Sequence, residues 1–225
     1  MNELKRLPGA GRVPTHEEMP RTWQRMLSGR IVHVLDPSPL DYEIEDIALS
    51  LSRESRWNGQ TEGEWGYSVN QHELFVLDLL LLDYPAAPAA LRRATMIHDG
   101  PEVILRDTIT PVKAILKPAG YEELERRHQI AMHIRFDIPP VLPEAWQVLI
   151  KNADRRAAFN EAVLLAGWPE DLARKEFGRP RDEKLARKRI DPWPPREAYE
   201  RFLATWNRYA VAPETGALSA MNAKA

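Results

Sequence analysis

The 225-residue sequence contains no cysteine, which excludes disulfide bonds and zinc sites built from thiolates. Histidine, aspartate and glutamate would have to hold any metal ion. A basic excess is also missing: the formal net charge is −2, whereas dedicated nucleic-acid binders usually carry a strong positive excess. Both absences fit a cytoplasmic protein without a dedicated nucleic-acid surface.

Long hydrophobic runs are scarce as well. The longest, over residues 74–82, is interrupted by Asp78 and is too short to span a bilayer. The first ten residues lack the apolar core of a signal peptide. We therefore expect no membrane association. Hydrophobic residues still make up 44% of the chain, enough for one domain with extensions.

Strand patterns are rare, whereas helical spacing of apolar residues is frequent. Residues 31–35 form a short β-type run that ends at a turn cluster, residues 36–39. A short helix is expected in residues 17–27. The sequence thus predicts an all-α fold, a helical bundle with a small or absent β element near the N-terminus.

Prolines divide the expected helices from one another. These helices cover residues 43–55, 68–82, 89–99, 111–117, 121–137, 144–167 and 196–209. The expected organisation is a lead-in (1–27), a core (28–168), a helical C-terminal extension packed on the core (169–212) and a loose tail (213–225).

The segment from Met96 to Lys113 carries the densest set of reactive side chains. It places His98 beside Asp99, and an imidazole and a carboxylate are both good ligands for a divalent cation. Glu102 follows one helical turn later, close enough to reach a water bound to that cation. Further on, Asp107 can accept hydrogen bonds from sugar hydroxyls, and Lys113 can bind phosphate.

Two more potential ligands, His72 and Asp154, fall on other expected helices with apolar surroundings. Buried ionisable groups are uncommon unless they are paired or bound to a metal, so we expect these residues to share one cation with His98 and Asp99. His128 and His133 are five residues apart in a charged helix, and we expect both on the surface.

The order His72, His98-Asp99, Asp154 resembles the H…HD…D pattern of the HD-domain phosphohydrolases. With Arg56-Trp57 upstream and Thr110-Pro111-Val112-Lys113 downstream, the set is similar to the YfbR-like branch of bacterial 5′-deoxynucleotidases. Residues 44–72 also resemble phage proteins that include dATP triphosphohydrolases. The resemblance covers roughly residues 31–165.

This resemblance implies an all-α HD-domain core with one divalent metal ion, whose identity among Mn, Fe, Co, Ni, Zn and Mg stays open. It assigns the metal to His72, His98, Asp99 and Asp154. It also implies catalytic roles for Glu102 and Asp107, with Glu102 acting on the attacking water. Arg56, Trp57 and Lys113 would bind the nucleotide substrate, the first two near the sugar and Lys113 at the phosphate.

Two departures leave the substrate open: Glu73 follows His72 where these deoxynucleotidases typically have serine, and Gly100-Pro101 precedes the glutamate. A triphosphate would need more cationic side chains than a monophosphate. The available ones are Arg53, Arg56, Arg92, Arg93, Arg106 and Lys113.

The alternative to an enzyme is a non-catalytic HD-domain protein that binds a nucleotide or a protein partner as a sensor. We also expect a possible homo-oligomer, with subunit contacts made by residues 169–189 together with Trp193 and Trp206.

Overall fold

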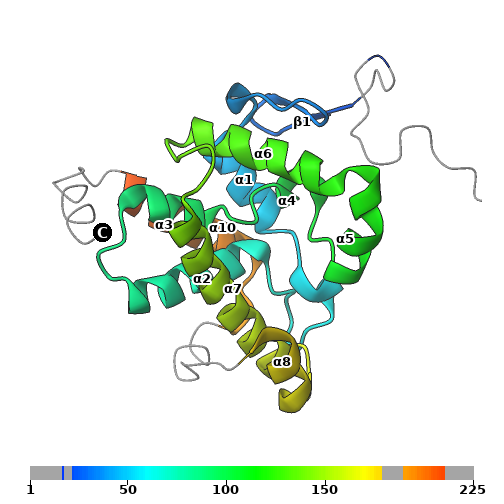
Figure 1. Ribbon diagram of the computed structural model, residues 1–225, viewed down its shortest axis with the longest axis vertical. Helices are drawn as coiled ribbons and strands as arrows, with labels where there is room; N and C mark the ends of the chain where they lie inside the picture. The colour runs from blue at the N-terminus through cyan, green and yellow to red at the C-terminus, as the bar shows by residue number, and fades with distance from the viewer. Residues whose placement is uncertain (1–16, 18–21, 179–189, 211–225) are drawn as a thin grey trace, which may run out of the picture.

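The computed structural model describes residue 17, residues 22–178 and residues 190–210. Most of these residues are helical, and the two described strands form one small antiparallel sheet near the N-terminus (Figure 1). The expected all-α fold with a small N-terminal β element is therefore confirmed. The expected tail, residues 213–225, lies outside the described residues.

The sheet is a hairpin of β1 (Trp23–Arg25) and β2 (Ile31–His33), with Gln24 opposite Val32. Gly29 supplies the left-handed conformation that the turn needs, with φ +95°. The helix expected in residues 17–27 is wrong where the structure describes it, because pairing with β2 draws residues 23–25 into a strand. The predicted β-type run also ends earlier, at His33.

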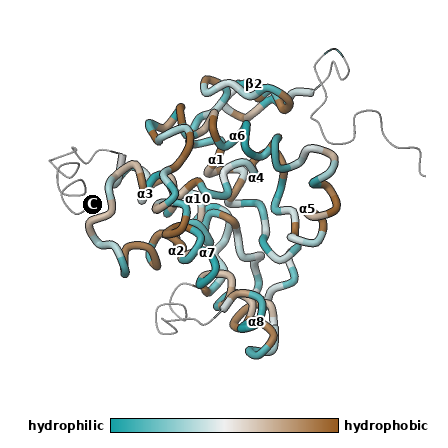
Figure 2. The backbone as a smooth tube through the Cα atoms, viewed as in Figure 1, coloured by the Kyte–Doolittle hydropathy of each residue, from teal (hydrophilic) through white to brown (hydrophobic). Residues whose placement is uncertain are grey.

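The central helix is α2 (Val69–Asp83), which begins where the Ser68 hydroxyl accepts a hydrogen bond from the Gln71 backbone N–H, 3.2 Å away. Hydrophobic residues colour much of α2 in Figure 2, and most of its side chains are buried. A helix that is apolar on nearly every face needs neighbours on several sides. These neighbours are α7 (Glu144–Leu164), α3 (Ala89–Met96) and α10 (Pro195–Ala210).

The remaining elements surround this centre, with the hairpin and α8 at opposite ends of the molecule (Figure 1). They are η1 (Pro39–Asp41), α1 (Ile44–Leu51), η2 (Arg56–Gly59), α4 (Glu102–Leu105), α5 (Thr110–Leu116), η3 (Lys117–Ala119), α6 (Tyr121–Arg135) and α8 (Glu170–Phe177). Within the described ranges, none of the helices has both the length and the apolar character required to cross a membrane.

The helix α10 packs against α1, α2 and α3, so part of the expected C-terminal extension belongs to the main hydrophobic core. Trp206 is only 5% exposed and contacts the rings of Phe136 and Phe202. The expectation that Trp206 serves a subunit contact is therefore wrong, because its surface is used inside the protomer. The homo-oligomer itself stays a prediction.

His128 and His133, expected on the surface, are both buried in α6. Nε2 of His128 donates to the Val34 carbonyl oxygen at 2.8 Å, and its Nδ1 accepts from the Tyr42 hydroxyl. Charged residues surround His128 in the sequence, so the sequence did not indicate that this side of α6 is buried. The prediction failed because polar partners from the N-terminal segment satisfy the imidazole inside the fold.

Candidate metal centre

Four side chains from three distant parts of the chain converge at one point. His72 comes from α2, His98 and Asp99 from the turn after α3, and Asp154 from α7. Nε2 of His72 lies 3.4 Å from Oδ1 of Asp154 and 3.6 Å from Oδ2 of Asp99, and Nε2 of His98 lies 3.5 Å from the same Oδ2. Donor atoms of His72, His98 and Asp154 all lie within 4.8 Å of one another, so this group could hold a metal ion.

Both imidazole rings are held in the orientation that a metal ligand needs. Nδ1 of His72 is 2.6 Å from a carboxylate oxygen of Glu161, and Nδ1 of His98 is 2.9 Å from the Thr95 carbonyl oxygen. These partners only accept hydrogen bonds, so in each neutral ring Nδ1 carries the proton and the Nε2 lone pair faces the cluster. Both Nε2 atoms are buried without a hydrogen-bond partner. A cation between them would satisfy both, so the donor set fits a metal.

The electrostatic field at the cluster favours positive charge. Burial and the nearby Arg56 lower the pKa of His72, but Glu161 and Asp154 outweigh them and raise it to about 9. Burial alone would raise the pKa of Asp154, yet its contact with His72 holds that pKa well below the usual range. Ionised carboxylates therefore surround the two Nε2 atoms, which is the environment that attracts a divalent cation.

The turn that presents Asp99 explains why glycine occupies position 100. A Cβ on Gly100 would lie 2.8 Å from Sδ of Met132 and 2.9 Å from the Ile97 carbonyl oxygen, closer than real Cβ contacts. The Glu102 backbone N–H donates to the Asp99 carbonyl oxygen at 3.0 Å, which starts α4 directly after this turn. Glycine at position 100, a departure from the deoxynucleotidase pattern, thus allows the backbone to pass close to Met132 and Ile97 in this turn.

Glu73 holds the backbone of the candidate ligand Asp99 in place. Its Oε1 accepts a hydrogen bond from the Asp99 backbone N–H at 2.9 Å and lies 3.8 Å from Nδ1 of His98. Burial, followed by the charge of Asp99, raises the pKa of Glu73 well above its ordinary value. Glu73, the departure from the deoxynucleotidase pattern at the position after His72, therefore holds the His98-Asp99 turn against α2.

Sequence reasoning missed Glu161, which joins His72 to the loop that carries Arg56 and Trp57. Its carboxylate accepts from Nδ1 of His72, from Nε of Arg56 at 2.9 Å and from Nε1 of Trp57 at 3.0 Å. Burial opposes ionisation, but Arg56 and His72 lower the pKa of Glu161 to about 2. A signal was present: Glu161 follows Asp154 by seven residues, which places both on one face of α7 two turns apart.

The two predicted sugar-binding residues have different surroundings. Arg56 lies at the cluster, because its Nη1 is 3.3 Å from Oδ2 of Asp99. The Trp57 ring packs edge-on against Trp168 and Phe177, with centroids 5.6 and 6.1 Å apart. Trp57 is therefore anchored on α8 and its preceding loop, at the edge of the site.

A second charged group lies beside the cluster. Nζ of Lys113 is 3.6 Å from Oε1 of Glu102 and 3.0 Å from Oε1 of Glu125. Glu102 is buried, and burial together with the charge of Asp99 raises its pKa well above the ordinary value. Its Oε2 has no hydrogen-bond partner. Such a carboxyl group can hold a proton near neutral pH.

Asp107 is positioned through its backbone rather than through its carboxylate. Its N–H donates to Oε1 of the buried Glu54 at 3.2 Å. Burial raises the pKa of Asp107, although the positive charge of Arg56 opposes the rise. Sequence reasoning gave no role to Glu54, whose position near the end of α1 carries no recognisable signal.

Comparison with known proteins adds a relationship but no activity. No family model matches the chain. The chain is 45% identical over 186 residues to an uncharacterized protein of Rhodobacter capsulatus, an alignment that covers 83% of this chain and 94% of that protein. Identity at this level over most of both chains shows common descent. The chain therefore belongs to the same family as this uncharacterized Rhodobacter capsulatus protein.

Proposed function

We propose that the protein is a divalent-metal-dependent phosphohydrolase of the HD-domain type that acts on nucleotides. One observation carries this proposal: two buried imidazole nitrogens without hydrogen-bond partners face two carboxylates at 3.4 to 3.6 Å, in the order His72, His98-Asp99, Asp154. A buried arrangement of this kind is costly unless a cation completes it.

A divalent ion on these four ligands would supply Lewis acidity toward a phosphoryl oxygen and lower the pKa of a coordinated water. The protein's own part is to hold the ligands in place. Glu161 and the Thr95 carbonyl fix the two imidazole rings, and Glu73 fixes the backbone of Asp99. Supports of this kind typically change metal affinity or activity by about 10- to 100-fold when they are removed.

Glu102 is the group best suited to move a proton. In its ionised form Glu102 can accept a proton from the attacking water and then return it to the leaving oxygen, and its raised pKa makes that form a stronger base. Lys113 lies 3.6 Å from it and is partly exposed, so its ammonium group can bind phosphate oxygens from the solvent side. We assign Asp107 to the sugar hydroxyls, and Arg56 to the sugar and phosphate next to Asp99.

The distribution of cationic side chains favours a substrate with one phosphate. Of the six cationic residues considered above, the two on α3 donate to backbone carbonyl oxygens of other segments. Arg53 and Arg106 line a separate cavity that none of the four candidate ligands lines. Arg56 and Lys113 are the two that contact residues of the cluster or its neighbour Glu102. A 5′-deoxynucleotidase activity is therefore proposed ahead of triphosphate hydrolysis.

The test is phosphate and polyphosphate release from a panel of dNMPs, NMPs and dNTPs with Mn, Co or Mg. We expect release of inorganic phosphate from deoxynucleoside monophosphates. Asp99→Ala should abolish it, and Glu102→Gln should lower kcat by about 10²- to 10⁴-fold. Glu122 is an exposed carboxylate on α6 that pairs with Lys117. The variant Glu122→Gln is therefore the matched control and should retain full activity.

Polyphosphate release from dNTPs alone would refute the monophosphate as the substrate. It would still support metal-dependent hydrolysis of nucleotides. If the protein binds the metal and a nucleotide but hydrolyses no member of the panel, the proposed enzymatic activity is refuted. That outcome would establish the alternative, a non-catalytic nucleotide-binding sensor.

A further inference from the structure

Three aromatic side chains from two distant segments meet beside the candidate metal centre. Trp57 belongs to η2, Trp168 lies in the loop before α8, and Phe177 ends that helix. The ring centroids are 5.6 Å apart for Trp57 and Trp168, 6.1 Å for Trp57 and Phe177, and 5.8 Å for Trp168 and Phe177. All three distances fall within the roughly 4.5 to 7 Å that stabilising aromatic pairs favour. We call this group the aromatic triad.

The aromatic triad packs on a small hydrophobic cluster that is separate from the main core. Its buried members are Phe159 and Ala162 of α7 and Ala173 of α8. The helix α8 lies against α7, at the end of the molecule opposite the hairpin (Figure 1). Since Ala173 is the buried residue of α8, this helix adds little apolar surface to the interior. What its inner side does enclose is the ring of Trp57.

The backbone at Trp57 has a conformation that tryptophan rarely adopts. Trp57 has φ 57° and ψ 27°, and the next residue, Asn58, has φ 51° and ψ 31°. Left-handed values are unfavourable for residues with a Cβ atom, and they are exceptional for a bulky aromatic residue. Such strain persists only where surrounding contacts hold the residue in place. The aromatic triad supplies contacts of this kind to the Trp57 side chain.

The same turn directs two successive side chains at one atom. Nε of Arg56 and Nε1 of Trp57 both donate to Oε2 of Glu161, at 2.9 and 3.0 Å. Successive side chains of a regular strand or helix point in different directions, so this shared acceptor depends on the left-handed turn. The other oxygen of Glu161 lies 2.6 Å from Nδ1 of His72. A continuous series of contacts therefore leads from α8 through Trp57 and Glu161 to a candidate metal ligand.

We propose that Trp168 and Phe177 are positioning residues for the metal centre. They hold the Trp57 ring so that its indole N–H stays on Glu161, and Glu161 in turn orients His72 toward the cation. The helix α8 thereby takes part in the site through Trp57, although it lies outside the segment that resembles the HD-domain phosphohydrolases. This inference rests on the proposed function for the metal ion, whereas the hold on Trp57 is measured without one.

The first measurement is the hydrogen exchange of the indole N–H groups, by NMR on the metal-free full chain. The chain has seven tryptophans, and the Trp57 signal is the one that disappears in Trp57→Phe. Phe177→Ala removes one ring of the aromatic triad and keeps every indole. It should speed the exchange of the Trp57 indole N–H about tenfold or more, since a hydrogen bond to a charged acceptor contributes about that factor. The indole signal of Trp206, in the main core, should not change.

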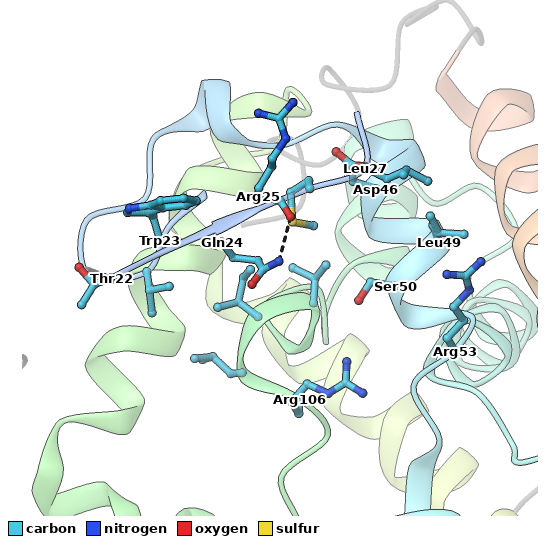
Figure 3. Close-up of a pocket in the computed structure, with 15 residues that line it drawn as sticks. Thr22, Trp23, Gln24, Arg25, Leu27, Asp46, Leu49, Ser50, Arg53 and Arg106 are labelled. Atoms are coloured by element: carbon cyan, nitrogen blue, oxygen red, sulfur yellow. Dashed lines mark hydrogen bonds between the residues drawn. The ribbon is translucent and has the colours of Figure 1, made fainter. Parts of the chain in front are cut away.

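Three further variants serve as controls. Leu49→Ala also removes a partly buried apolar side chain, but Leu49 lines the cavity under the N-terminal hairpin (Figure 3), which no ring of the aromatic triad lines. Leu172→Ala shortens an exposed side chain on α8 itself. Both should leave the exchange of the Trp57 indole N–H within about twofold of the wild type. Phe177→Tyr keeps the ring and should keep the slow exchange.

The second measurement is metal affinity, by calorimetry with Mn and with Co. Phe177→Ala should bind the metal about tenfold more weakly, at the low end of the effect of losing a group that orients a ligand. Trp57→Phe removes the indole N–H that Glu161 accepts. In that background, Phe177→Ala should cause no further loss of affinity, because both changes break the same series of contacts.

Unchanged exchange of the Trp57 indole N–H in Phe177→Ala would overturn the proposal, whether or not the chain binds metal. Losses of metal affinity that add in the double variant would also overturn it, because Phe177 would then act by a route other than Trp57. A wild type that binds neither metal would refute the proposed function. The exchange measurement alone would then decide whether the aromatic triad holds Trp57 on Glu161.

Discussion

Among single residues, Glu161 joins the candidate metal centre to the loop that precedes α2. One buried carboxylate receives hydrogen bonds from an imidazole, a guanidinium and an indole. It thereby fixes the ring of His72 and the loop that carries Arg56 and Trp57. Glu73 has the corresponding role for Asp99. His72 and Asp99 are thus oriented by carboxylates outside the set of candidate ligands.

Replacement of Glu161 by glutamine tests this support. The amide keeps the size of the side chain but removes its charge and turns one acceptor into a donor, which removes one of the two carboxylates, Glu161 and Asp99, that pair with Arg56. We expect a loss of about 3 kcal/mol in the free energy of unfolding and about 10- to 100-fold weaker metal binding. Urea unfolding and metal titration measure the two effects.

Glu176→Gln is the matched control, because Glu176 is an exposed carboxylate on α8. Its free energy of unfolding should stay within about 0.5 kcal/mol of the wild type. Unchanged metal affinity in Glu161→Gln would contradict the supporting role of this residue.

Among the elements, α6 is joined to the N-terminal segment by the arginines at positions 127 and 135 and by the buried imidazole of His128. His128 binds the Val34 carbonyl and the Tyr42 hydroxyl, on the two sides of the turn that contains η1. Burial lowers the pKa of His128, because a charged imidazole would lose its hydration there. The unfolded chain therefore binds a proton at a higher pH than the folded one does.

This difference predicts how stability depends on pH. The contribution of His128 is fully present above the unfolded pKa of about 6.5 and is lost as the pH falls toward its lower folded value. His128→Gln should cost about 1 to 3 kcal/mol at pH 7.5, and its deficit relative to the wild type should shrink by pH 5.5. Urea unfolding at several pH values measures the deficit. A deficit independent of pH would contradict the neutral buried state.

The whole molecule shows which features the sequence predicts and which it does not. Apolar runs and helical spacing determine α2 and α7 locally, so their existence was predictable. The strand β1 was not, because a three-residue segment depends on its partner across the sheet. The cluster of His72, His98, Asp99 and Asp154 was predictable as a set. Its distances, and the buried carboxylates behind it, arise from the packing of α2 on α7.

The same geometry makes a prediction for the entire fold. The candidate ligands lie at positions 72, 98–99 and 154, so an ion held by all of them ties together three segments that are far apart in the unfolded chain. A ligand that binds only the folded state stabilises it by about 2.7 kcal/mol at one hundred times its Kd. For a chain of this length, that gain raises Tm by roughly 5 to 10 °C.

Thermal unfolding in Mn, Co, Ni, Zn, Fe or Mg measures this rise, and EDTA should reverse it. Asp154→Asn should lose most of the rise in Tm, since it weakens one ligand while leaving the packing of α7 intact. Lys151→Gln, one turn earlier on α7 and paired with Asp154 from the solvent side, should keep it. An equal rise in Asp154→Asn and the wild type would mean that the ion binds elsewhere. No rise with any of the six metals would show that the four side chains form a purely structural ion-pair network.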